Sequence, residues 1–62
     1  MEKPVCVLIG EHGNVFNVIG RVAKALKKVG LVGQAKEFTD RAFTSNSYDY
    51  VLQLAMEYVE VI

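Results

Sequence analysis

Two side chains able to take part in chemistry, Glu11 and His12, stand next to each other in a short glycine-containing segment, residues 10–14. The segment follows an apolar run and precedes a helical pattern, and loop amides together with a helix N-terminus can bind an anion. The spacing matches neither the Walker loop nor the dinucleotide fingerprint, and Glu11 puts negative charge where a phosphate would sit. We therefore interpret residues 10–14 as a structural turn, with an anion site as the alternative, and His12 as an exposed loop residue.

The remaining candidates for catalysis or metal binding are few. The chain has one histidine and one cysteine, so a zinc site made from its own side chains is not expected. No nucleophile stands in a recognisable pattern with a base, and no motif of paired carboxylates occurs. Cys6 lies in the apolar run with no evident cationic neighbour, which is typical of a small buried side chain. The sequence predicts no enzyme activity, no metal and no cofactor.

A stripe of cations in residues 14–30 is the clearest candidate for a binding surface. At about 100° per residue, Arg21, Lys24 and Lys28 lie on one side of a helix with Lys27 beside them, and the segment holds no acidic residue. Cations in the last turn also stabilise a helix, so a solvated face is one interpretation. The other is contact with a polyanion or a partner through Arg21, Lys24, Lys27 and Lys28.

The helix that carries this stripe is predicted over about residues 15–29. The face opposite the cations is apolar and should lie in the core; it comprises Val15, Val18, Ile19, Val22, Leu26 and Val29. Asn14 is a suitable N-cap and Gly30 a suitable end. A β-hairpin over residues 5–20 is the alternative, but the helical spacing continues through Leu26 and Val29, which favours the helix.

Gly20 is unusual inside this helix, because glycine lowers helix stability by about 1 kcal/mol relative to alanine. It lies between Phe16 and Ala23 on the flank of the helix. One explanation is that a second backbone approaches closely at this point. We therefore expect a contact between copies of the chain at Phe16, Gly20 and Ala23.

Two further helices and one strand are predicted around the central helix. The apolar, β-branched run at about residues 4–9 predicts a strand covered on both sides or nearly so. A second helix is expected at about 33–43, with the ion pairs Lys36–Asp40 and Glu37–Arg41 on its outer face. A third helix is expected at about 48–58, with Ser47 as its N-cap. The short connection before the second helix predicts that the first two pack as a hairpin.

Residues 59–62 either finish the third helix or form a short C-terminal strand. A lone N-terminal strand would leave backbone groups unpaired along both edges, so it needs a neighbour. We favour pairing with the C-terminal segment, and pairing between two chains is the main alternative. The predicted fold class is α+β, mostly α, in a single domain spanning residues 1–62.

A chain of 62 residues buries only about 60% of the surface that its unfolded form exposes, so its core is marginal without support. A single cysteine forms no disulfide within the chain, and the hydrophobic content of 52% is enough to supply a contact surface. We therefore expect a homodimer or higher assembly, and a homo-oligomeric protein-interaction module is the leading functional hypothesis.

Nucleic-acid binding through the basic face of the central helix is the alternative function. Seven basic and seven acidic residues cancel, so global charge favours neither nucleic acid nor a membrane. A helix-turn-helix is not favoured, because the third helix would present Asp49, Glu57 and Glu60 to phosphates. No signal peptide or membrane span is evident, which predicts a cytoplasmic protein without membrane contact.

Several short motifs resemble a family of small uncharacterised proteins of bacteria and their phages or mobile elements. They are Ile9-Gly10-Glu11, Gly13-Asn14, Phe16, Gly20-Arg21-Val22, Ala25-Leu26, Ser47-Tyr48-Asp49, Leu52 and Met56-Glu57-Tyr58-Val59-Glu60. The likeness covers nearly the whole chain, although the position of His12 is more often acidic in that pattern. It implies a cytoplasmic bacterial or phage origin and carries no activity with it.

Overall fold

The fold is mostly helical, with a short strand at each end. The structure is a computed structural model, and it describes residues 3–8, 15–45 and 47–62. Its elements in chain order are β1 (Val5–Cys6), α1 (Val15–Lys28), α2 (Val32–Phe43), α3 (Tyr48–Tyr58) and β2 (Glu60–Val61). The predicted α+β class and the three helices are confirmed, and the hairpin alternative is wrong because its second arm lies in α1.

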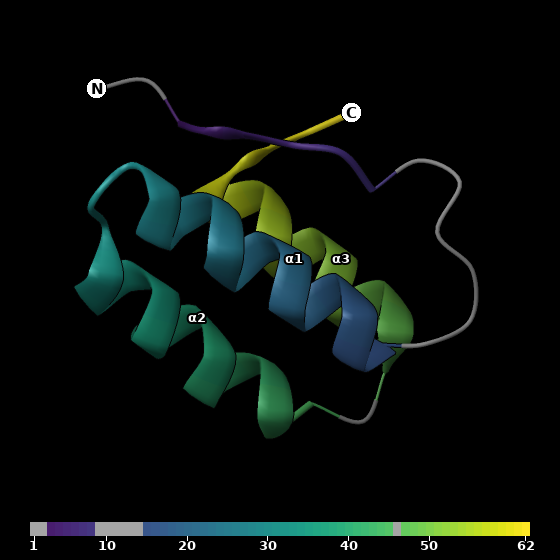
Figure 1. The fold of residues 1–62 in the computed structure, drawn as a ribbon. Helices are drawn as coiled ribbons and strands as arrows, with labels where there is room; N and C mark the ends of the chain where they lie inside the picture. The colour runs from purple at the N-terminus through teal and green to yellow at the C-terminus, as the bar shows by residue number, and fades with distance from the viewer. Residues whose placement is uncertain (1–2, 9–14, 46) are drawn as a thin grey trace.

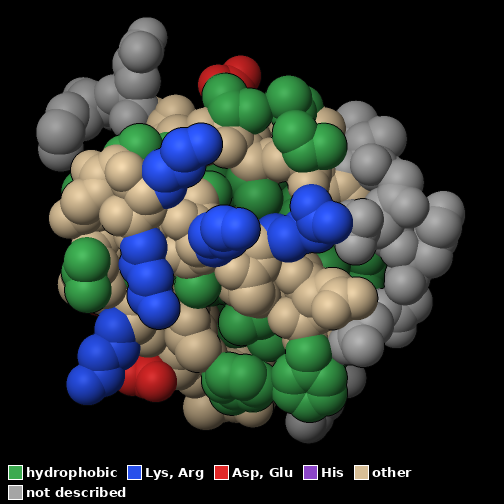
Figure 2. All heavy atoms as spheres, viewed as in Figure 1, with side chains coloured by type: hydrophobic (Ala, Val, Ile, Leu, Met, Phe, Trp, Pro, Cys, Tyr) green, Lys and Arg blue, Asp and Glu red, His purple; other side chains and the backbone are tan. Residues whose placement is uncertain are grey.

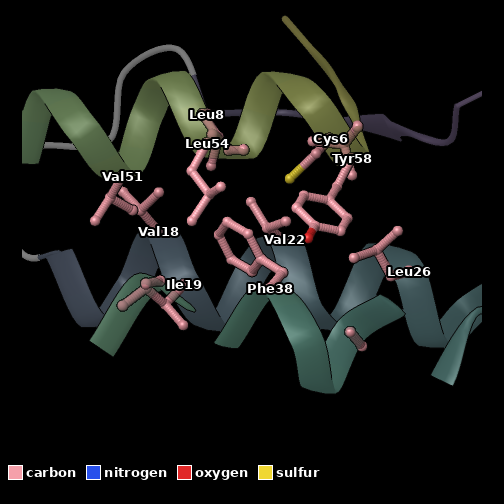
Figure 3. Packing of buried hydrophobic residues seen from close by; sticks show 14 residues of the cluster. Cys6, Leu8, Val18, Ile19, Val22, Leu26, Phe38, Val51, Leu54 and Tyr58 are labelled. Atoms are coloured by element: carbon pink, nitrogen blue, oxygen red, sulfur yellow. The ribbon is translucent and has the colours of Figure 1, made fainter. Parts of the chain in front are cut away.

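The elements form three layers. Figure 1 shows α1 and α3 side by side, with the two strands across one side of this pair and α2 on the other. The apolar faces of the helices meet between the layers, where Phe38 of α2 points between α1 and α3 (Figure 3). Phe38 of α2, Val22 of α1 and Ala55 of α3 are each 0% exposed, so the core lies where the three helices meet. No helix in the described part of the chain is both long and apolar enough to cross a membrane.

The C-terminal end of α1 is set by Gly30, as the sequence predicts. Gly30 has a φ of 85°, a conformation that glycine adopts without strain. The amide of Leu31 donates to the carbonyl of Leu26 at 2.9 Å, and that of Gly30 donates to Lys27 at 3.0 Å. This pair of bonds is a Schellman motif. Because the helix has ended, Val29 turns outward and is 55% exposed, so its predicted place in the core is wrong.

The start of α3 is also as predicted, whereas the outer face of α2 is not. The hydroxyl of Ser47 accepts a hydrogen bond from the amide of Tyr50 at 3.3 Å, which confirms the N-cap. Neither Lys36–Asp40 nor Glu37–Arg41 is an ion pair in the described structure. The structure instead pairs Arg41 with Glu57 of α3, at 3.8 Å. Contacts across the helix interface have replaced the expected pairs along one helix.

The N-terminal strand pairs with the C-terminal segment of its own chain, which confirms the favoured alternative. The strands are parallel, with Val5 opposite Glu60 and Cys6 opposite Val61. Two-sided coverage of the N-terminal strand is wrong: Cys6 and Leu8 are buried, but Val5 and Val7 are 54% and 56% exposed. The reason is that α1 and α3 cover one face of this sheet and leave the other bare.

Candidate functional site

All four cations predicted as a contact surface lie exposed on α1. Their positions follow from the helical period, since Val18, Ile19, Val22 and Leu26 turn toward the core and occupy the opposite face. Figure 2 shows lysine and arginine side chains gathered over α1. The predicted two-faced character of the central helix is therefore present in the fold.

The tertiary structure separates Lys27 from the other three cations, of which Arg21 and Lys24 also line a hollow with Phe16 and Gly20. Arg21, Lys24 and Lys28 line a groove of about 490 Å³ whose other wall is β1. We call it the β1–α1 groove, and its apolar lining includes Val5, Val7, Ala25 and Val29. Lys27 lies on the other flank of α1, in a hollow shared with α2 residues such as Lys36 and Asp40. The sequence shows one basic stripe, but the fold makes a groove of three cations and a separate fourth.

Cys6 lies at the β1–α1 groove, and the structure brings a cation closer to it than the sequence suggests. Burial raises the pKa of the Cys6 thiol, and the nearby charge of Arg21 lowers it by less. The expected absence of a cationic neighbour is therefore wrong. The net rise in pKa still favours the neutral thiol, which is the form that packs as a small hydrophobic group.

A second candidate surface surrounds the predicted contact between copies. Phe16 and Gly20 are exposed, and Ala23 is half-buried. Phe16 meets Phe43 of α2 with 5.7 Å between ring centroids, and these rings are 63% and 56% exposed. We call Phe16, Gly20 and Phe43 the Phe16–Phe43 patch. A hollow of about 350 Å³, lined in part by Ile19, Ala42 and Tyr48, lies beside the two rings.

Gly20 has open space where a side chain would begin. Among the described residues, a Cβ added there would meet no atom within 4 Å, apart from the neighbouring backbone of its own helix. The glycine is therefore not required by packing against that part of the chain. It leaves bare helix backbone at the surface, in a hollow that it shares with Phe16, Arg21 and Lys24, where another molecule can approach closely.

A buried tyrosine, Tyr58, links α2 to α3, and no local sequence pattern indicates its partners. The Tyr58 hydroxyl donates a hydrogen bond to Glu37, and it accepts one from Arg41 Nη1 at 2.8 Å. Burial raises the pKa of Tyr58, and the hydrogen bond to Glu37 raises it further, against the smaller effect of Arg41. We call Glu37, Arg41, Glu57 and Tyr58 the α2–α3 seam. The polar groups of the seam bond to one another. The seam therefore joins α2 to α3 and is not a candidate functional site.

The sequence-predicted anion site lies outside the described residues, as do His12, Glu11 and the N-cap Asn14. Among the residues that are described, no group of three or more histidine, cysteine, aspartate or glutamate side chains is placed to hold a metal ion. The candidate surfaces are therefore the β1–α1 groove and the Phe16–Phe43 patch.

Comparison with known proteins identifies no relative of this chain. No family model, no curated protein and no solved structure matches the chain. The candidate surfaces are therefore interpreted from their own geometry and chemistry.

Proposed function

We propose that this chain is a protein-interaction module that associates with a second copy of itself through the Phe16–Phe43 patch. The observation that carries the proposal is the pair of exposed phenylalanine rings beside the open backbone of Gly20. The patch supplies both a projection and an adjoining hollow. In a two-fold dimer the same surface is used twice, so the rings of one copy can enter the hollow of the other.

The size of the chain favours self-association over an unsupported monomer. Sixty-two residues without an internal disulfide form a small core, and association is a common source of additional burial. Covering one exposed phenylalanine removes on the order of 100 Å² from water, worth about 2.5 kcal/mol. The four rings of a dimer would contribute about 10 kcal/mol, against an association cost of roughly 4–15 kcal/mol. At the lower end of that cost the net gain is about 6 kcal/mol, so we expect a weak dimer with a Kd no tighter than about 40 μM.

The experiment is sedimentation velocity over a wide range of protein concentration, with matched glycine variants. Gly20→Gln should raise the stability of the monomer by a few tenths of a kcal/mol, because glutamine is the better helix former. It should also weaken the dimer at least tenfold, because a side chain now fills the approach. Gly33→Gln is the control, since Gly33 in the first turn of α2 has equally open surroundings and lies outside the patch.

The possible results distinguish a dimer through Gly20 from a monomer and from a dimer through another surface. A concentration-dependent dimer that Gly20→Gln weakens and Gly33→Gln preserves would support the proposal. A folded monomer at every concentration would reject it. A dimer whose affinity changes equally in both variants would show that the contact does not include Gly20.

Nucleic-acid binding is the second candidate, and one observation favours it. Arg21, Lys24 and Lys28 share an exposed wall, and no acidic residue lies on α1. Three phosphate contacts would give a salt dependence with a slope of about −2.7 in log K against log salt. Anisotropy titrations with duplex DNA test this, and Lys24→Gln with Lys28→Gln should reduce the slope by about 2. No binding at low salt would exclude it.

A further inference from the structure

The outer edge of β1 carries backbone groups that the sheet does not use. The carbonyls of Pro4 and Cys6 accept hydrogen bonds from the amides of Glu60 and Ile62, at 2.8 and 3.1 Å. The amide of Leu8 donates to the carbonyl of Ile62 at 2.8 Å. Successive residues of a strand direct their backbone groups to opposite edges, so those of Val5 and Val7 point away from β2. Within the described residues, no backbone hydrogen bond reaches these four groups.

This edge borders the β1–α1 groove, whose far wall is basic. Lys24 and Lys28 lie there beside Arg21, and no ion pair of either lysine is present among the described residues. Between the cations and the strand, the groove is lined by Ala25 and Val29. Figure 1 shows β1 running alongside α1, and the residues that line the groove place apolar side chains and cations next to this strand edge.

We propose that the β1–α1 groove binds an extended acidic segment of a partner protein, which adds to β1 as a third strand. The segment pairs its backbone with Val5 and Val7, as in other cases of strand addition. Every second side chain then points toward α1, where short apolar groups meet Ala25 and Val29 and carboxylates reach Lys24 and Lys28. The proposal goes beyond self-association and is centred on the edge of β1, although Arg21 and Lys24 also line the hollow that contains Phe16 and Gly20.

Charge and hydrogen bonding together favour this occupant over a second copy or a nucleic acid. The β1 strand of another copy would bring Lys3 and its own basic α1 wall toward the same cations, which repel it. A nucleic acid would use the cations, but it would leave the amides of Val5 and Val7 and the exposed valines without partners. An acidic strand can pair with the backbone edge, contact the apolar residues and neutralise the cations, so it matches all three features of the groove.

The experiment measures binding of a short, end-blocked, fluorescent peptide of alternating glutamate and valine by anisotropy. The same peptide with N-methyl groups on alternate amides keeps the charge and cannot complete a ladder, and an alternating lysine–valine peptide reverses the charge. Duplex DNA is a further arm. The protein variants are Val7→Pro and the pair Lys24→Gln with Lys28→Gln, and circular dichroism checks that each variant is folded.

Val7→Pro removes an amide on the open edge, so no bond to β2 is lost and the fold is retained. The control for the lysine pair is Lys27→Gln with Lys36→Gln, which makes the same charge change in the hollow on the other flank of α1. If Val7→Pro proves unfolded, Val7→Glu reports instead, because it keeps the amide and places a negative charge on the exposed face of the strand, where it repels the acidic segment.

We expect the acidic peptide to bind and the lysine–valine and N-methylated peptides to bind at least tenfold more weakly. Val7→Pro should abolish binding, Lys24→Gln with Lys28→Gln should weaken it roughly fivefold or more, and the control pair should leave it unchanged. Absence of binding at millimolar peptide would overturn the proposal. So would equal binding of the N-methylated peptide, or DNA binding that needs the lysines and ignores Val7→Pro.

Failure of this proposal can be distinguished from failure of the proposed dimer. Loss of self-association in Val7→Pro would show that a second copy occupies this edge and would overturn the acidic-segment proposal. Loss of self-association in Gly20→Gln with peptide binding intact would support both proposals. A monomer at every concentration that still binds the peptide would reject the dimer alone.

Discussion

The α2–α3 seam and the β1–α1 groove both hold charged side chains, but they differ in where the partners of those charges lie. At the seam, Arg41 has Tyr58 and Glu57 within reach, and the Tyr58 hydroxyl also has Glu37. At the groove, Lys24 and Lys28 face apolar residues and a strand edge. Charges that find partners inside the chain hold the fold together, whereas charges without them remain available to another molecule.

The guanidinium of Arg41 shows how tightly the seam is organised. It lies 5.9 Å from the centre of the Tyr58 ring, and its hydrogen bond to that hydroxyl raises the pKa of Arg41. Phe38 supports the same ring edge-on, with 5.5 Å between centroids. At the groove, neither Lys24 nor Lys28 forms an ion pair with another residue that the structure describes. Four tests compare the two regions, and each measures the free energy of unfolding by denaturant at a protein concentration where the monomer predominates.

The largest expected difference comes from removing one apolar side chain from each region. Phe38→Ala should lower the free energy of unfolding by about 3–5 kcal/mol, because Phe38 is 0% exposed and its loss leaves a cavity. Val29→Ala in the groove should change it by no more than about 0.5 kcal/mol, because Val29 is 55% exposed. Similar losses for the two variants would mean that the groove belongs to the core.

The next effect comes from the polar part of the seam. Tyr58→Phe keeps the buried ring and removes the hydroxyl that joins Glu37 to Arg41. Because both partners remain partly in water, we expect a loss of about 1 kcal/mol in the free energy of unfolding. An unchanged free energy would mean that the ring alone holds α2 to α3.

A smaller effect should appear on raising the pH. Burial and Glu37 hold the pKa of folded Tyr58 above that of the unfolded chain. Its contribution is therefore complete below about pH 10 and is lost as the pH rises through the folded pKa. Burial also raises the pKa of Cys6, whose contribution falls in alkali in every variant. The wild type should lose more stability than Tyr58→Phe, and parallel profiles would contradict this account.

The smallest effect is expected from the cations of the groove. Replacing both Lys24 and Lys28 by glutamine should change the free energy of unfolding by less than about 0.5 kcal/mol. Removing the two charges loses a small stabilising interaction with the helix dipole near the C-terminus. Weaker repulsion between neighbouring cations offsets this loss. A loss above about 1 kcal/mol would show that these lysines have a structural partner, and the contrast with the seam would fail.

The sequence alone determined the helices, because their signals are local. The period of Val18, Val22 and Leu26 sets the inward face of α1, Gly30 ends that helix, and the Ser47 hydroxyl begins α3. Each of these interactions spans only a few residues, so it can be recognised without knowing the fold. The need of the N-terminal strand for a neighbour was equally clear, since unpaired backbone is costly.

The tertiary structure decided how these elements meet, and with it both candidate surfaces. Sequence spacing pairs Glu37 with Arg41, but the packing of α2 against α3 turns both toward Tyr58, 21 and 17 residues away. Likewise, the stripe on α1 became a groove because β1 lies beside Lys24 and Lys28 and leaves Lys27 on the other flank. Such neighbours depend on how all the layers pack at once, and no local pattern of residues encodes that.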